Sequence, residues 1–177
     1  MNLKALLSAT LLLCLPIFAQ AQSKQTKITP LQYNDKLVSI TDSLYSLGQQ
    51  WGETYAKIAG ADNDFSKLGE KRKVISAFTT RKIAEVQKGQ SVGKGGDELK
   101  NAVLDFLAFE KKMIDDAFVP IEKLNASSSQ AEKDAAIQKL TKQAEQESAV
   151  LKKVNDAQIS YGKQNGFEIE AAPTTTE

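Results

Sequence analysis

Four segments of the chain repeat apolar residues at spacings of three and four, over lengths typical of bundle helices. The clearest stripe lies in residues 30–59 and comprises Tyr33, Leu37, Ile40, Leu44, Leu47, Trp51, Tyr55 and Ile58. At about 100° per residue these positions share one side of an α-helix. Comparable stripes lie in residues 64–88, 97–124 and 129–163, and no stretch alternates with period two. The pattern predicts an all-α fold, an up-down four-helix bundle within residues 30–167.

Local signals mark the ends of these helices. Thr29-Pro30 is a start signal, and Gly60 follows the first stripe. Residues 129–132 read Ser-Gln-Ala-Glu, the spacing of a capping box. Asp97 is placed to act as the N-cap of the third helix, which Pro120 should kink or break near its end. The connections between the helices are therefore expected to be short.

Two glycines interrupt the first helix beside its apolar stripe. Gly48 and Gly52 are four residues apart, and each costs about 1 kcal/mol relative to alanine in a helix interior. We expect a compensating gain. It is either a groove in which a neighbouring helix backbone approaches closely, or the close approach of a partner or ligand.

The first 21 residues have the pattern of a secretory signal peptide. Lys4 precedes an apolar run over residues 5–18, and Ala19-Gln20-Ala21 supplies small residues for cleavage. Residue 14 is the single cysteine, but leucine precedes it where lipidation requires a small residue, so we expect no lipid anchor at Cys14. We expect an exported protein, periplasmic or at the cell surface. Residues 22–29 form a flexible leader, and residues 168–177 a disordered tail.

The charge balance bears on the kind of partner. Removal of Lys4 with the signal peptide leaves 22 basic and 22 acidic residues, so the mature chain is neutral. Nucleic-acid binding depends on excess positive charge, and we expect none here. We also expect no integral membrane span after cleavage.

The sequence argues against several common kinds of catalytic, phosphate-binding and metal-binding site. It contains no histidine, and its one cysteine lies in the signal peptide, which excludes Ser-His-Asp and Cys-His catalysis and ordinary zinc sites. The loop KGQSVGKGGDELK, residues 88–100, has three residues where a phosphate-binding loop needs four, and we interpret it as a flexible connector. The turn at Asp62 to Asp64 begins like a calcium loop but lacks the later glycine and glutamate.

The remaining carboxylates do not form catalytic pairs in sequence. Asp115 and Asp116 are adjacent and point about 100° apart on a helix, and Glu145 and Glu147 also lie on different faces. We therefore expect no enzyme: no catalytic, cofactor-binding or metal-binding residues, and no cofactor. An internal chamber ringed by carboxylates would contradict this expectation.

Two sets of residues are candidate contact sites. The second segment is strongly basic, and Lys73, Arg81 and Lys88 could contact an acidic partner or a polyanion. Alternatively, its charges complement the acidic third segment at the rim of their packing. Trp51 and Tyr55 could line a ligand cavity between helices, although residues at this spacing are more often part of the core.

Residues 31–44 (LQYNDKLVSITDSL), residues 97–116 and the last helix together resemble a family of small exported helical-bundle proteins of Gram-negative bacteria. These are surface or lipoprotein-like proteins without an assigned activity, and their motif-like element here is residues 33–36 (YNDK). The resemblance implies a periplasmic or surface location and no catalytic residues. The leucine before Cys14 departs from the lipoprotein-like members.

The function expected from the sequence is therefore non-enzymatic: an exported bundle that acts through contacts with an envelope protein. The alternative is a small-ligand or cation binder that uses an inter-helix cavity near Trp51 or the Asp62 to Asp64 turn. A third possibility is a polyanion-docking module on the second helix. Oligomeric state and partner identity do not follow from the sequence.

Overall fold

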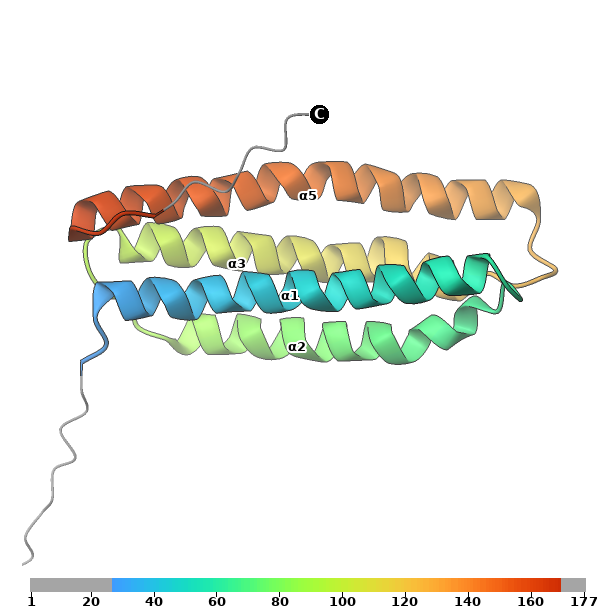
Figure 1. Ribbon diagram of the computed structural model, residues 1–177, viewed down its shortest axis with the longest axis horizontal. Coiled ribbons are helices and arrows are strands. Elements are labelled where there is room, and N and C mark those ends of the chain that lie inside the picture. Colours follow the sequence, from blue (N-terminus) through green and yellow to red (C-terminus); the bar gives the residue numbers. More distant parts are fainter. Residues whose placement is uncertain (1–26, 170–177) are drawn as a thin grey trace, which may run out of the picture.

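The computed structural model describes residues 27–169, and this part of the chain is helical with no strand. The long helices are α1 (Pro30–Ala59), α2 (Gly69–Lys88), α3 (Gly96–Met113) and α5 (Gln130–Asn165). Figure 1 shows them side by side, each running opposite to the one before it. The limits of α1 and α5 lie close to the predicted ones. The predicted segment 64–88 begins with a separate 3-10 helix, η1 (Phe65–Leu68), and the predicted segment 97–124 is divided into α3, a π-helical turn and a short helix. The predicted signal peptide with Cys14, most of the leader and residues 170–177 lie outside the described residues.

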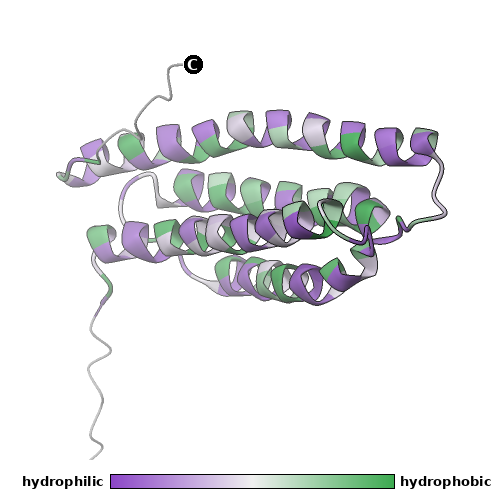
Figure 2. Cartoon of the chain, turned by 45° about the vertical axis from the view of Figure 1, so that its right-hand side comes forward, coloured by the Kyte–Doolittle hydropathy of each residue, from purple (hydrophilic) through white to green (hydrophobic). Residues whose placement is uncertain are grey.

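The helix α3 lies at the centre of the arrangement. It packs against α1, α2 and α5, and α2 and α5 lie on opposite sides of it (Figure 1). Figure 2 shows hydrophobic residues along much of α3, whereas hydrophobic and hydrophilic patches alternate along α5. The fully buried residues of α3 include Leu99, Val103 and Leu107. The apolar stripe predicted for this segment is thus the middle of the core.

Capping boxes begin the first and the last helix. The Thr29 hydroxyl accepts a hydrogen bond from the Gln32 N–H at 3.2 Å, and the Gln32 side chain accepts one from the Thr29 N–H at 3.0 Å. Ser129 and Glu132 form the same reciprocal pair at the start of α5. Each box satisfies two donors that a helix end would otherwise leave unpaired. The predicted capping box at residues 129–132 is confirmed.

The start of α3 differs from the prediction. The N-cap position is Gly95, with φ of 71°, and Asp97 lies inside the first turn. The Asp97 carboxylate accepts a hydrogen bond from the Ser91 hydroxyl instead of capping the helix. The left-handed backbone at Gly95 lets the chain turn sharply, so the helix begins earlier than Asp97.

Pro120 neither breaks nor ends the third helical segment abruptly. Because proline has no N–H to donate, the preceding residues Ile114–Phe118 widen into one π-helical turn, η2. The Val119 N–H then donates to the Ile114 carbonyl, and the short helix α4 (Val119–Glu122) accommodates Pro120 in its first turn. The helical path continues with a local change of pitch.

The glycine-rich connection between α2 and α3 is held against the end of α5. The Asn165 side chain accepts a hydrogen bond from the Lys94 N–H at 3.1 Å and donates one to the Lys94 carbonyl at 2.8 Å. The Tyr161 hydroxyl donates to the Val92 carbonyl at 2.6 Å. Gly93 has φ of 75°, and a side chain there would overlap Asn165. These glycines serve a close backbone approach between elements of the bundle.

Candidate functional site

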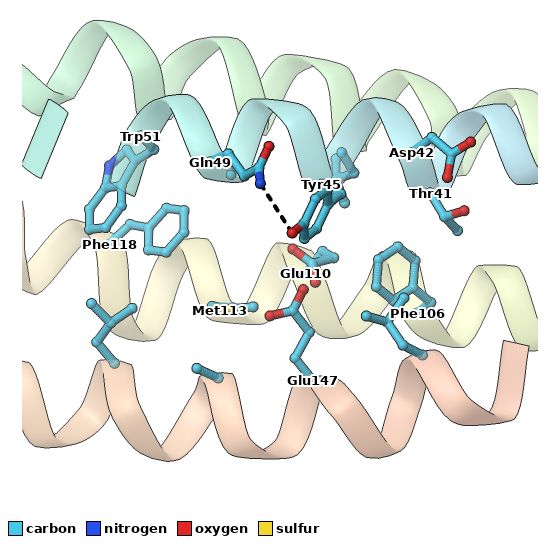
Figure 3. Close-up of a pocket in the computed structure, with 15 residues that line it drawn as sticks. Thr41, Asp42, Tyr45, Gln49, Trp51, Phe106, Glu110, Met113, Phe118 and Glu147 are labelled. Carbon is cyan, nitrogen blue, oxygen red and sulfur yellow. Dashed lines mark hydrogen bonds between the residues drawn. The ribbon is translucent and has the colours of Figure 1, made fainter. Parts of the chain in front are cut away.

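A cavity of about 500 Å³ lies between α1, α3 and α5 near the middle of the bundle. Figure 3 shows side chains of all three helices pointing into it. Most of its walls are apolar or aromatic: Leu44, Trp51, Phe106, Met113, Phe118, Leu140 and Leu151. Its volume and lining are typical of a small-molecule site.

Two carboxyl groups meet inside this apolar cavity. Glu110 comes from α3 and Glu147 from α5, and in Figure 3 the Glu147 carboxyl points toward that of Glu110. Glu110 is only 7% exposed, and its Oε1 atom has no hydrogen-bond partner among the described residues. A buried polar atom without a partner costs about 1–3 kcal/mol. The site therefore holds a polar group that the protein leaves unsatisfied.

The surroundings of these carboxyls disfavour ionisation. Burial, the negative charge of Glu147 and a hydrogen bond to it raise the pKa of Glu110 to about 8. Burial also raises the pKa of Glu147, although its hydrogen bond with Glu110 opposes the shift. Two carboxylates cannot both ionise cheaply at short range in an apolar site. At neutral pH the Glu110 carboxyl therefore retains its proton in most molecules.

Of the two candidate aromatic residues, only Trp51 lines the cavity. Trp51 is 3% exposed, and its ring stacks on Phe118 with centroids 4.1 Å apart and planes 8° apart. Tyr55 does not line the cavity. Its ring stacks on Trp51 with centroids 5.8 Å apart and also packs on Phe65, so Tyr55 supports Trp51.

Polar residues of α1 border the cavity at the surface. Asp42, Tyr45 and Gln49 are exposed, and Gln49 Nε2 donates to the Tyr45 hydroxyl at 3.1 Å. Figure 3 shows Tyr45 pointing from α1 toward Glu110. A molecule entering between α1 and α5 would pass these residues before it reached the buried carboxyls.

The prediction that a neighbouring helix backbone packs closely against Gly48 and Gly52 is wrong. A Cβ atom built on either glycine meets no atom within 4 Å, so no neighbouring helix backbone approaches them. Gly48 instead lines the cavity, and Gly52 does not. The missing side chain at Gly48 therefore leaves open space in the cavity, where a larger residue would occupy it.

The three basic residues proposed for partner contact are exposed but lie along the length of α2. Lys73, Arg81 and Lys88 are all at the surface, and Arg81 pairs with Glu85 at 3.8 Å. The predicted charge complementarity between the second and third segments is represented by an ion pair between Arg72 and Glu122, in which both side chains are partly buried.

The turn with the weak calcium-loop pattern is occupied by its own lysine. Lys67 forms ion pairs with Asp62 and with Asp64, the latter at 3.7 Å. The hydrogen bond from Lys67 is the main cause that lowers the pKa of Asp62. Within the described residues, no group of three or more acidic, histidine or cysteine side chains is placed to hold a metal ion.

Sequence reasoning did not single out Glu110 as a site residue, and it rejected Glu147 only as a partner of Glu145. A signal for both was present in the helical period. Glu110 continues the stripe of Phe106 and Met113, and Glu147 lies on the stripe of Leu140, Ala144 and Leu151. Acidic residues are rarely buried on the apolar face of a helix unless they are paired, and here α3 and α5 each carry one on such a face.

Comparison of the chain with protein-family models, with curated proteins and with solved structures finds no match. Across residues 27–169, none of the helices combines the length and apolar character needed to cross a membrane.

Proposed function

We propose that this protein is an exported, non-enzymatic bundle that binds a small, largely apolar molecule in the cavity between α1, α3 and α5. The cavity carries the proposal: its volume of about 500 Å³ and its apolar walls suit a small molecule. The export part rests on the signal-peptide pattern of residues 1–21. Of the functions expected from the sequence, the geometry supports the ligand binder best.

Gly48 adds independent support. Glycine in a helix interior costs about 1 kcal/mol relative to alanine, and no packing contact offsets that loss at this position. Because glycine has no side chain, position 48 leaves open space in the cavity. A bound ligand would occupy this space and offset the cost of the glycine.

The contact with an envelope protein remains a prediction with less support. Lys73, Arg81 and Lys88 are accessible to an acidic partner or a polyanion, but Arg81 is already paired with Glu85. These residues do not surround a groove or a pocket with an unsatisfied group, as the residues of the cavity do.

A filled-cavity variant tests the proposal. We expect the neutral fluorescent probe N-phenyl-1-naphthylamine to bind the purified protein and Gly48→Leu to weaken binding about tenfold or more, because the leucine occupies the site. Gly52→Leu is the matched control, since Gly52 also has open space but does not line the cavity. Fluorescence titration measures both.

The proposal fails if the probe does not bind, or if Gly48→Leu and Gly52→Leu bind it as well as the unaltered protein. Far-ultraviolet circular dichroism checks that both variants remain helical. Loss of binding in both variants to the same extent would also contradict a site at Gly48.

A further inference from the structure

We infer that the molecule bound in the cavity is an organic monocation: one ammonium group on an apolar body, with the ammonium held between Glu110 and Glu147. This inference rests on the proposed binding function and names the chemical class of the ligand. Three observations carry it: the unpartnered buried carboxyl, the charge of the lining and the aromatic walls.

The first observation is the position of Glu110. It lies on the apolar face of α3 between Phe106 and Met113, is 7% exposed, and presents an Oε1 atom without a partner. An ammonium group has three donors and no acceptor. It therefore supplies a donor for Oε1 of Glu110, and hydrogen bonds from an ammonium group to a carboxylate are of the strong, charge-assisted kind.

The second observation is the sign of the charges in the cavity. Among the described residues that line it, Asp42, Glu110 and Glu147 are acidic and none is lysine or arginine. The protein therefore provides no counter-charge of its own. A divalent metal ion is the less suitable occupant, because calcium takes six to eight oxygen ligands and no three acidic side chains of the described residues are placed to hold a metal ion together.

The third observation is the composition of the walls. Four aromatic residues from α1, α3 and η2 border the same space: Tyr45, Trp51, Phe106 and Phe118. Aromatic faces attract an ammonium group within about 6 Å of the ring and also cover an apolar body. A site for an amphiphilic amine combines these walls with buried carboxyls.

The ionisation of Glu110 gives the site a pH dependence. Burial and the neighbouring carboxylate raise the pKa of Glu110 to about 8, so this carboxyl gains negative charge as the pH rises from 6 to 8. An ammonium ligand favours the ionised carboxylate, and its affinity should therefore rise over this range.

Three other titratable groups line the cavity around Glu110. α1 contributes Asp42 and Tyr45, and α5 contributes Glu147. Asp42 and Tyr45 are exposed, whereas Glu110 is buried and faces Glu147. The group assigned to the change between pH 6 and 8 is Glu110, whose pKa is raised to about 8.

Three matched probes test the ligand class: 4-phenylbutylammonium, the neutral 4-phenylbutan-1-ol and the anion 4-phenylbutanoate. Titration at pH 7.5 in moderate salt is followed by the fluorescence of Trp51, the one tryptophan of the chain, and by calorimetry. We expect the ammonium probe to bind at least about tenfold more tightly than the alcohol, because a hydrogen bond to a charged group contributes about 1.5–3 kcal/mol. The anion should bind most weakly.

Glu110→Gln and Glu147→Gln should each remove the preference for the ammonium probe and leave alcohol binding within about twofold of the original. Glu145→Gln is the matched control, since it removes the same charge from an exposed site on α5 outside the cavity. It should preserve the preference. Both cavity variants are expected to fold, because each replaces a buried ionisable group by a neutral one of similar size.

The outcomes separate the two levels of inference. If the alcohol binds as tightly as the ammonium probe, or if Glu110→Gln retains the preference, the cation inference is wrong while the binding function stands. Tightest binding of the anion also overturns it. If none of the three probes binds and N-phenyl-1-naphthylamine does not bind either, the proposed function itself fails.

Discussion

The two halves of α5 contact the rest of the bundle in different ways. From Val154 onward the helix is anchored: Val154 and Tyr161 are buried, and Tyr161 packs on Tyr33 with ring centroids 6.0 Å apart. None of the described residues 137–153 is buried. Here the apolar stripe of the helix faces the cavity. The helix is thus held firmly at its C-terminal end and spans an unfilled space in its middle.

This difference teaches that a regular apolar stripe does not by itself create a filled core. Leu140 and Leu151 have the spacing of core residues but are only half-buried, and Ile137 is 43% exposed. In contrast, the anchored end adds polar contacts to its packing, including those of Tyr161 and Asn165 with the α2–α3 connection. Stability should therefore be concentrated at that end and capacity for binding in the middle.

The largest expected effect separates a core leucine near the anchored end from a leucine of the cavity. Leu99 is fully buried in the first turn of α3, where the Tyr33 hydroxyl donates to the Gly96 carbonyl, so Leu99→Ala should lower the free energy of unfolding by about 2–5 kcal/mol. Leu140→Ala should cost about 1 kcal/mol, because this side chain already borders open space. Urea unfolding measures both changes. Equal losses would mean that the two regions are equally well packed.

The second effect concerns the pH dependence of stability. In the native state the Glu110 pKa is about 8, against about 4.5 for an ordinary glutamate. The native state therefore binds the proton more tightly. Its contribution to stability is fully present below pH 4.5 and is lost as the pH rises to 8, at up to about 1.4 kcal/mol per pH unit.

Glu110→Gln should remove this loss. Compared with the unaltered protein, the variant should have a similar free energy of unfolding at pH 4.5 and one about 2 kcal/mol higher or more at pH 8. Urea unfolding at the two pH values gives the difference, and Glu145→Gln serves as the exposed control. If Glu110→Gln is less stable than the unaltered protein at pH 8, the ionised Glu110 carboxylate stabilises the fold, and its surroundings do not disfavour ionisation.

The smallest expected effect is a contrast between two glycines, whose replacement by alanine should change the stability in opposite directions. Gly93→Ala should destabilise the protein by about 2 kcal/mol, because the residue has φ of 75° and its side chain would overlap Asn165. Gly48→Ala should stabilise it by up to about 1 kcal/mol, since nothing lies within 4 Å of the new methyl group. Thermal unfolding of the two variants compares them directly. Destabilisation by Gly48→Ala would show that the cavity wall is tighter than the structure indicates.

Much of the fold could be predicted from the sequence because its determinants are local. A helical stripe and a capping box each relate residues three or four positions apart, and the stripe of α1 and the box at Ser129 were both recognised. Pro120 predicts a kink or break near the end of the third helix, and the regular α-helix is indeed interrupted before it, but by a widened π-helical turn that the sequence does not specify. The position of Asp97 failed as a cap because glycine at position 95 moved the start of the helix.

The site was less predictable because its determinants are not local. Trp51 was a candidate for a cavity on the strength of its helix and its neighbours, and it does line one. Glu110 and Glu147 could be noticed only as acids on apolar stripes, since nothing in the sequence aligns one helix axially with another. Gly48 and Gly52 look alike in sequence, and only one of them borders the cavity.

By itself, the sequence determined four helices, where most of them begin and end, and which side chains are missing from their chemistry, histidine above all. The tertiary structure decided that a buried acid of α3 and a partly buried acid of α5 face each other across an incompletely filled space. The physical reason is that a helix forms from interactions within a turn or two of its own chain, whereas a cavity depends on how separate helices rotate and slide against each other.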